Sequence, residues 1–135
     1  ALPIYKKSEY NDININTLDN CLENANYVIT CCPLNKHTFH LLNKEKILLC
    51  QKGVKIINVG RGPIICEADV IELLENGFID SVGLDVFEEE PLSRDNRLRN
   101  FKQNIFGTHN GSNTLEAVDK VSNKVLTILH KFLHI

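Results

Sequence analysis

Three stretches of this sequence carry residue types that could act together on a small carboxylic acid: Arg61, the acidic run 85–90 and His109. The planar guanidinium of an arginine can bind a carboxylate through two parallel hydrogen bonds, which a lysine cannot do. A histidine can exchange a proton with a hydroxyl or a carbonyl, and a carboxylate beside it can orient the ring and stabilise its charged form. Each residue also has a structural interpretation, as a surface arginine, a packed histidine or a solvated acidic face.

The elements that must position these residues alternate between strand and helix patterns. Strands are predicted over 27–32, 54–59, 81–86 and 104–107, and helices over 17–25, 44–50, 67–76 and 113–133. Asn16 and Asn43 are predicted caps, Gly53 and Gly77 are predicted terminators, and 92–103 is predicted to be irregular. The last helix carries one apolar side, formed by Leu115, Val118, Val121, Val125, Ile128, Leu129 and Phe132.

Alternation of this kind predicts an α/β fold with four parallel strands and right-handed crossovers. The carboxyl ends of parallel strands lie along one edge of the sheet, where such folds bind ligands. Arg61, the acidic run and His109 each follow a predicted strand. We therefore expect them to converge at that edge, in a sheet that is only half of a complete domain.

Composition narrows the classes of partner. The 135 residues are 43% hydrophobic and 24% charged, and the formal net charge of -2 predicts no binding to nucleic acid. No apolar run reaches the roughly 20 residues of a membrane helix, so no membrane partner is predicted. The five cysteines are odd in number and form no Cys-x-x-Cys pair, so neither a disulfide framework nor a structural zinc site is predicted. Reduced thiols in a cytoplasmic protein are the simplest interpretation.

Four blocks together resemble the D-isomer-specific 2-hydroxyacid dehydrogenases, the family of D-3-phosphoglycerate, D-lactate and glycerate dehydrogenases. The blocks are 25–34 with 38–43, 58–62 with Glu67, 83–87 with Glu90 and Pro91, and 108–114 with Glu116 and Ala117. They occur in the family's order and spacing from about Leu18 to the C-terminus. The resemblance implies a Rossmann-like sheet with flanking helices and a hydride transfer between NAD(H) and a D-2-hydroxy acid or 2-oxo acid.

The resemblance also implies roles for individual residues. Arg61 would bind the substrate carboxylate and polarise the 2-oxo group, His109 would be the acid/base, and Glu90 would be the partner of that histidine. Asp85 would face the nicotinamide carboxamide. The cofactor pocket would be lined by Cys32, Pro33, Thr38, Val59 and Gly60. No metal is implied, and the longer protein would be a homodimer.

The sequence departs from the family pattern in places. Gly60 stands where alanine is common, and Gly107 and Thr108 replace a proline before the histidine. The family's Gly-x-Gly-x-x-Gly loop does not occur, because Ile65 occupies the third glycine's place after Gly60 and Gly62.

We therefore expect the phosphate loop and the substrate domain before residue 1, where the chain reads as if cut from a longer one. Residues 1–135 would then be the C-terminal portion of the NAD-binding domain, a fragment inactive by itself. Two alternatives remain open at this point, a non-catalytic NAD-sensing corepressor-like protein and an inactive truncated copy.

Overall fold

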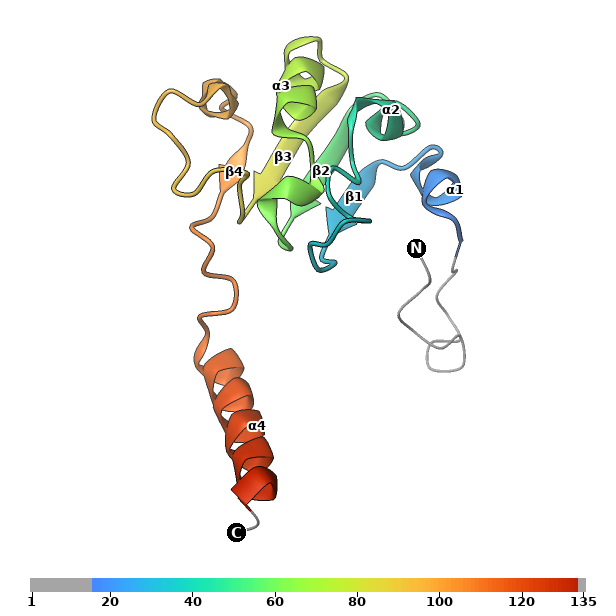
Figure 1. Ribbon diagram of the computed structural model, residues 1–135. Coiled ribbons are helices and arrows are strands. Elements are labelled where there is room, and N and C mark those ends of the chain that lie inside the picture. The colour runs from blue at the N-terminus through green and yellow to red at the C-terminus, as the bar shows by residue number, and fades with distance from the viewer. Residues whose placement is uncertain (1–15, 134–135) are drawn as a thin grey trace.

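A sheet of four parallel strands forms the centre of the part that this computed structural model describes, residues 16–133. The strands are β1 (Tyr27–Thr30), β2 (Val54–Asn58), β3 (Ile79–Leu84) and β4 (Ile105–Phe106), and they lie side by side in that order (Figure 1). The predicted parallel α/β sheet is confirmed. Arg61 follows the end of β2, the acidic run 85–90 follows the end of β3, and His109 follows the end of β4.

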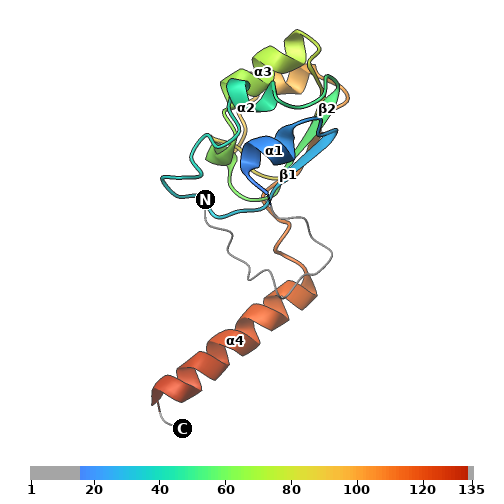
Figure 2. The ribbon, with the colours of Figure 1, turned by 90° about the vertical axis from the view of Figure 1, so that its right-hand side faces the viewer.

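One face of the sheet is covered and the other is open. Along β2 the side chains of Val54, Ile56 and Asn58 are buried, whereas the residues between them are only partly so. The buried face packs against three helices, α1 (Leu18–Leu22), α2 (Lys44–Ile47) and α3 (Glu67–Glu75), of which α2 and α3 lie on the same side of the strands in Figure 2. On the open face Tyr27 and Ile29 of β1 remain 63% and 61% exposed. Parallel sheets usually have helices on both faces, whereas the described residues provide helices for only one face of this sheet.

Local side-chain caps fix where the helices begin. Asn43 accepts a hydrogen bond from the backbone N–H of Lys46 at 3.0 Å, which confirms it as the cap of α2. The predicted cap of α1 was one residue off. Thr17, not Asn16, caps this helix and accepts from Asn20 N–H at 3.3 Å. Asn16 lies one residue before the cap position, and its side-chain oxygen accepts instead from the N–H of Thr17 and from the side-chain amide of Asn20.

The segment predicted to be irregular contains a short helix, so that prediction was wrong. The 3-10 helix η3 (Arg97–Asn100) begins at Asn96, whose side chain accepts from Leu98 N–H at 2.9 Å. Leu98 is fully buried against the core. A single apolar residue among charged neighbours shows no periodicity, so sequence pattern alone could not find it. A second 3-10 helix, η2 (Gly62–Ile64), directly follows Arg61.

The predicted C-terminal helix is confirmed as α4 (Leu115–Leu133), which projects away from the sheet (Figures 1 and 2). No residue of α4 is buried, and its apolar side is exposed along its whole length. Over residues 16–133, no helix combines the length and the apolar character that crossing a membrane requires.

Candidate active site

Arg61 lies in a turn that a buried asparagine organises. Asn58, the last residue of β2, is fully buried, and its side-chain oxygen accepts from Gly60 N–H at 3.0 Å and from the Thr30 hydroxyl at 2.8 Å. Its side-chain N–H donates to the carbonyl oxygen of Arg61 at 2.9 Å. The amide therefore replaces the hydrogen bonds that the backbone loses where the strand ends, and it directs Arg61 outward from the strand end.

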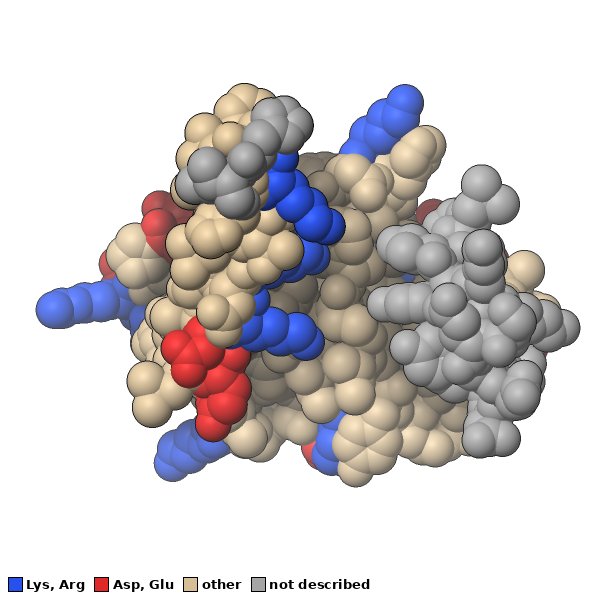
Figure 3. Space-filling model, turned by 90° about the horizontal axis from the view of Figure 1, so that it is seen from below, with Lys and Arg blue, Asp and Glu red and all other residues tan. Residues whose placement is uncertain are grey.

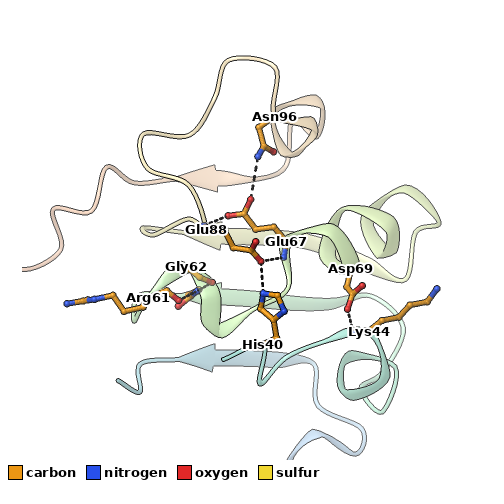
Figure 4. Close-up of polar contacts among 9 residues, drawn as sticks. His40, Lys44, Arg61, Gly62, Glu67, Asp69, Glu88 and Asn96 are labelled. Atoms are coloured by element: carbon orange, nitrogen blue, oxygen red, sulfur yellow. Dashed lines mark hydrogen bonds and ion pairs between the residues drawn. The ribbon is translucent and has the colours of Figure 1, made fainter. Parts of the chain in front are cut away.

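The guanidinium of Arg61 is exposed and points away from His40 and Glu88 (Figure 4). It donates one hydrogen bond, to the carbonyl oxygen of Gly60 at 2.7 Å. Among residues 16–133, no carboxylate lies within ion-pair distance of it. The remaining N–H groups of this arginine can therefore bind an external carboxylate.

The turn after Arg61 packs directly on the loop that follows β3. A Cβ placed on Gly62 would lie 1.8 Å from the carbonyl oxygen of Phe87 and 2.5 Å from the backbone nitrogen of Glu88. Only a residue without a side chain allows these two loops to approach so closely. Gly62 thus brings the Arg61 turn against the loop that carries Glu90.

His109 and Glu90 form a hydrogen-bonded pair. The Nδ1–H of His109 donates to Glu90 Oε2 at 2.7 Å, and the other carboxylate oxygen accepts from Phe87 N–H at 3.0 Å. The hydrogen bond from His109 holds the pKa of Glu90 below its usual value, and the Phe87 N–H and the nearby charges of His109 and Arg61 act in the same direction. Glu90 is therefore an ionised acceptor that leaves the Nε2 of His109 for another partner.

Asp85 fixes the loop that carries His109. Its carbonyl oxygen accepts from His109 N–H at 2.8 Å, and its carboxylate accepts from the backbone N–H groups of Gly111 at 3.1 Å and Asn110 at 3.4 Å. A Cβ on Gly107 would lie 2.1 Å from Asp85 Oδ1, so the glycine at this position permits the contact. These contacts keep His109 in a left-handed backbone conformation, with φ 56°. The predicted contact of Asp85 with nicotinamide stays a prediction.

A hollow of about 520 Å³ opens at the carboxyl ends of β1 and β2. It is lined by Cys31, Cys32, Pro33, Leu34, Val59, Gly60 and Arg61. Four of the five predicted pocket residues lie here. The fifth, Thr38, is buried outside the lining, where its hydroxyl donates to Pro33 O at 2.7 Å and accepts from Asn35 N–H at 2.8 Å. Thr38 therefore shapes the loop that forms the wall.

The side chains around this hollow are mostly uncharged. Its lining combines thiol, proline and aliphatic side chains with one cation, at the sheet edge where such folds bind nucleotides. Figure 3 views the molecule from this side and shows a largely uncharged surface, with Lys and Arg side chains both near its middle and at its rim and a group of Asp and Glu atoms at one place on it. A second hollow, of about 360 Å³, lies beside His109 and Glu90 on the side of β4 and includes Phe87, Leu92 and Phe106.

The residues that hold this arrangement together are Thr30, Asn58, Gly62 and Glu67. The sequence placed the last three in a family block without predicting their contacts, and it did not single out Thr30. Glu67 is buried, and its Oε1 accepts from Glu88 N–H at 2.6 Å while its own N–H donates to Glu88 Oε1 at 2.9 Å. Burial raises the pKa of the Glu67 carboxyl, against the effect of that N–H. The sequence did offer a signal for two of them. Asn58 is a polar residue at the end of an apolar strand, and Glu67 is one at the start of an amphipathic helix, where side chains often bond the backbone groups that the strand or helix leaves unpaired.

Residues 3–111 match the family described as D-isomer specific 2-hydroxyacid dehydrogenase, NAD binding domain. The chain belongs to this family. It is 43% identical over 113 residues to D-3-phosphoglycerate dehydrogenase of Bacillus subtilis (strain 168), covering 84% of this chain and 21% of that protein. It is 38% identical over 99 residues to glyoxylate/hydroxypyruvate reductase B of Serratia proteamaculans (strain 568), covering 73% of this chain and 30% of that protein.

The fold of the solved dehydrogenases agrees with this membership. The crystal structure of a glyoxylate reductase from Paecilomyes thermophila superposes with a TM-score of 0.84 at 28% identity, covering 93% of this chain and 38% of that one. The chain therefore spans between about a fifth and two fifths of the length of these 2-hydroxyacid dehydrogenases. The predicted family and its Rossmann-like fold are confirmed, with NAD as the cofactor named for the family.

Proposed function

We propose that this chain supplies the catalytic part of an NAD-dependent D-2-hydroxyacid dehydrogenase. The reaction is a reversible hydride transfer between NAD(H) and a D-2-hydroxy acid or its 2-oxo acid, of the kind that phosphoglycerate dehydrogenases carry out. The observation that carries the proposal is the 2.7 Å hydrogen bond between His109 Nδ1 and Glu90 Oε2, with Arg61 following β2, the strand that pairs with the strand before Glu90. An anion-binding arginine and a paired histidine are the two groups that this chemistry requires.

Arg61 binds the carboxylate of the substrate in this proposal. Its remaining N–H groups present two parallel donors, and a further N–H polarises the 2-oxo group. The Asn58 amide positions the guanidinium by holding the carbonyl oxygen of Arg61 at 2.9 Å. Binding and polarisation thus come from one side chain on a rigid turn.

His109 moves the proton in this proposal. In the direction of reduction, its Nε2–H donates to the 2-oxo oxygen, and the proton passes to that oxygen as the hydroxyl forms. Glu90 accepts from Nδ1–H and stabilises the charged ring before transfer, without taking the proton itself. In the direction of oxidation, the neutral Nε2 accepts the hydroxyl proton.

NAD(H) supplies the hydride acceptor or donor when bound. We propose that Cys32, Pro33, Val59 and Gly60 line the nicotinamide end, with Thr38 holding the wall behind them and Asp85 facing the carboxamide. The location of four of these residues in one open hollow supports this assignment.

The domain assignment and the dimer are also proposals. Residues 1–135 would form the C-terminal portion of the NAD-binding domain, with the phosphate loop and the substrate domain supplied by other sequence. The shares of 21% and 30% of the matched dehydrogenases support this. A homodimer of the longer protein stays a prediction, which a solution mass measurement tests.

The test is Arg61→Lys in a protein that joins this chain to a phosphate loop and a substrate domain. Lysine keeps the charge but loses the two-donor geometry, so kcat/KM should fall by roughly 30- to 900-fold, equivalent to about 2–4 kcal/mol of transition-state binding. Arg94→Lys, a matched change at an exposed arginine outside the site, should leave kcat/KM unchanged. A fall of less than about fivefold for Arg61→Lys removes the proposed role of Arg61. NADH binding without turnover of any 2-oxo acid by the parent protein would favour a nucleotide-sensing protein instead.

A further inference from the structure

Three side chains with metal-binding donors lie together at the start of α3, apart from the groups assigned to the reaction. His40, Cys66 and Glu88 each offer one donor atom, and these atoms lie within 4.8 Å of one another. Figure 4 shows His40 facing Glu88, with Arg61 pointing away from both. We propose that His40, Cys66 and Glu88 bind a zinc ion.

The donor set suits zinc. Zinc binds thiolate sulfur at about 2.3 Å, imidazole nitrogen at about 2.0–2.1 Å and carboxylate oxygen at about 2.0–2.2 Å. These bond lengths place neighbouring donors around a tetrahedral ion roughly 3.3–3.6 Å apart. The Nε2 of His40 already lies 3.1 Å from Glu88 Oε1, and the 4.8 Å limit leaves small side-chain rotations for the third donor. Magnesium and calcium prefer oxygen ligands, so a sulfur, nitrogen and oxygen set selects against them.

Hydrogen bonds fix the backbone of the segments that carry the three donors. His40 has φ 46°, in the left-handed region, and its N–H donates to a carbonyl oxygen of η2 at 2.8 Å. The N–H of Cys66, the residue just before α3, donates to Leu42 O at 3.1 Å. Glu88 and Glu67 exchange two hydrogen bonds, each from a backbone N–H to a carboxylate oxygen. The site therefore requires little ordering of the chain, which favours binding.

The three donors come from three separate segments: the turn before α2, the start of α3 and the loop after β3. Three protein ligands leave one tetrahedral position for a water molecule. Binding replaces the proton of the Cys66 thiol, which passes to solvent, and the neutral ring of His40 must carry its proton on Nδ1 so that Nε2 can bind the ion in place of its hydrogen bond to Glu88. The ion would cross-link the loop that carries Glu90 to the rest of the fold. A simple hydrogen bond between His40 and Glu88 would involve two of the three side chains, whereas a bound ion would also involve Cys66. Pairwise cysteine spacing could not predict this site, because its ligands meet only in space.

The test measures metal binding by the 135-residue chain, so it does not depend on the proposed catalysis. Zinc is titrated in competition with a chromophoric chelator, and Co²⁺ serves as a spectroscopic probe. We expect one zinc ion per chain and a thiolate-to-cobalt charge-transfer band. Zinc should also raise the thermal midpoint of unfolding, since it binds the folded chain.

Two substitutions remove a ligand while suiting the local backbone. Cys66→Ser supplies a residue preferred at helix N-caps, and His40→Asn supplies one that tolerates positive φ. Each substitution should weaken zinc binding at least tenfold and abolish the zinc-induced thermal shift. The far-ultraviolet circular dichroism spectrum of each variant should match that of the parent, which shows that the variant is folded. Glu88→Gln, which keeps an acceptor for Glu67 N–H, should do the same. The matched controls Cys21→Ser and His37→Asn, both at exposed positions outside the cluster, should bind zinc like the parent.

Parent affinity in Cys66→Ser or His40→Asn would overturn the proposal. A cobalt complex without a thiolate band would overturn it too, because that band reports the bond to Cys66. Loss of binding in Cys21→Ser equal to that in Cys66→Ser would show a nonspecific thiol site, which contradicts the proposed cluster.

Discussion

Replacing Asn58 with alanine should destabilise this chain more than its small change in size suggests. The amide is fully buried, and its removal leaves Gly60 N–H without an acceptor and the Thr30 hydroxyl with only the Ile57 carbonyl oxygen, at 3.4 Å. At about 1–3 kcal/mol for each buried polar group left unpaired, the expected loss is about 2–4 kcal/mol. Domains are stable by only about 5–15 kcal/mol, so this is a large fraction of the total.

Urea unfolding of the 135-residue chain, followed by circular dichroism, measures this loss. With a slope of about 2 kcal/mol/M, the midpoint should fall by about 1–2 M. Hydrogen exchange at the Gly60 amide should also become faster. Asn123→Ala, at an exposed position of α4, is the control and should change stability by less than about 0.5 kcal/mol. A loss below about 1 kcal/mol for Asn58→Ala would refute the view that this amide organises the turn.

Three further outcomes are expected. Gly62→Ala should cost at least about 3 kcal/mol in urea unfolding, because its Cβ would overlap the Phe87 carbonyl, whereas Gly83→Ala, whose Cβ would meet its nearest atom at 3.6 Å, should cost less than about 1 kcal/mol. At pH values above 4.5, the ordinary pKa of a glutamate, Glu90→Gln should be less stable than the parent, because the hydrogen bond from His109 stabilises the ionised carboxylate of Glu90. This difference in stability should disappear as the pH falls through the lowered pKa of Glu90, where the carboxylate takes up a proton. Unfolding curves measured at several pH values check this, and a constant difference would contradict it. The 135-residue chain alone should oxidise no NADH with any 2-oxo acid, because its sequence contains no Gly-x-Gly-x-x-Gly loop to hold the pyrophosphate, and measurable turnover would show this to be wrong.

The sequence by itself determined the order of the strands and α-helices, and the family. Strand and helix patterns alternate clearly along the chain, and the four family blocks occur in the family's order and spacing. The convergence of Glu90 and His109 was predictable as well, because residues after parallel strands must meet at one edge of the sheet. Local chemistry also sufficed for the Asn43 cap and for Gly77, which directly follows the C-cap of α3 with φ 71°. The prediction that Gly53 ends α2 was wrong, because that helix already ends at Leu48, although Gly53 does have a positive φ of 88°.

Only the tertiary structure decided which side chains hold the site together. The burial of Asn58 and Glu67, the contact of Gly62 with Phe87 and the burial of Leu98 all depend on segments distant in sequence. A residue's own type and its neighbours along the chain do not encode such contacts. The same reason applies to His40, Cys66 and Glu88, whose donors come from three segments with no spacing signature. Patterns along the chain report local periodicity, whereas packing, pairing and ligand geometry arise where those segments meet.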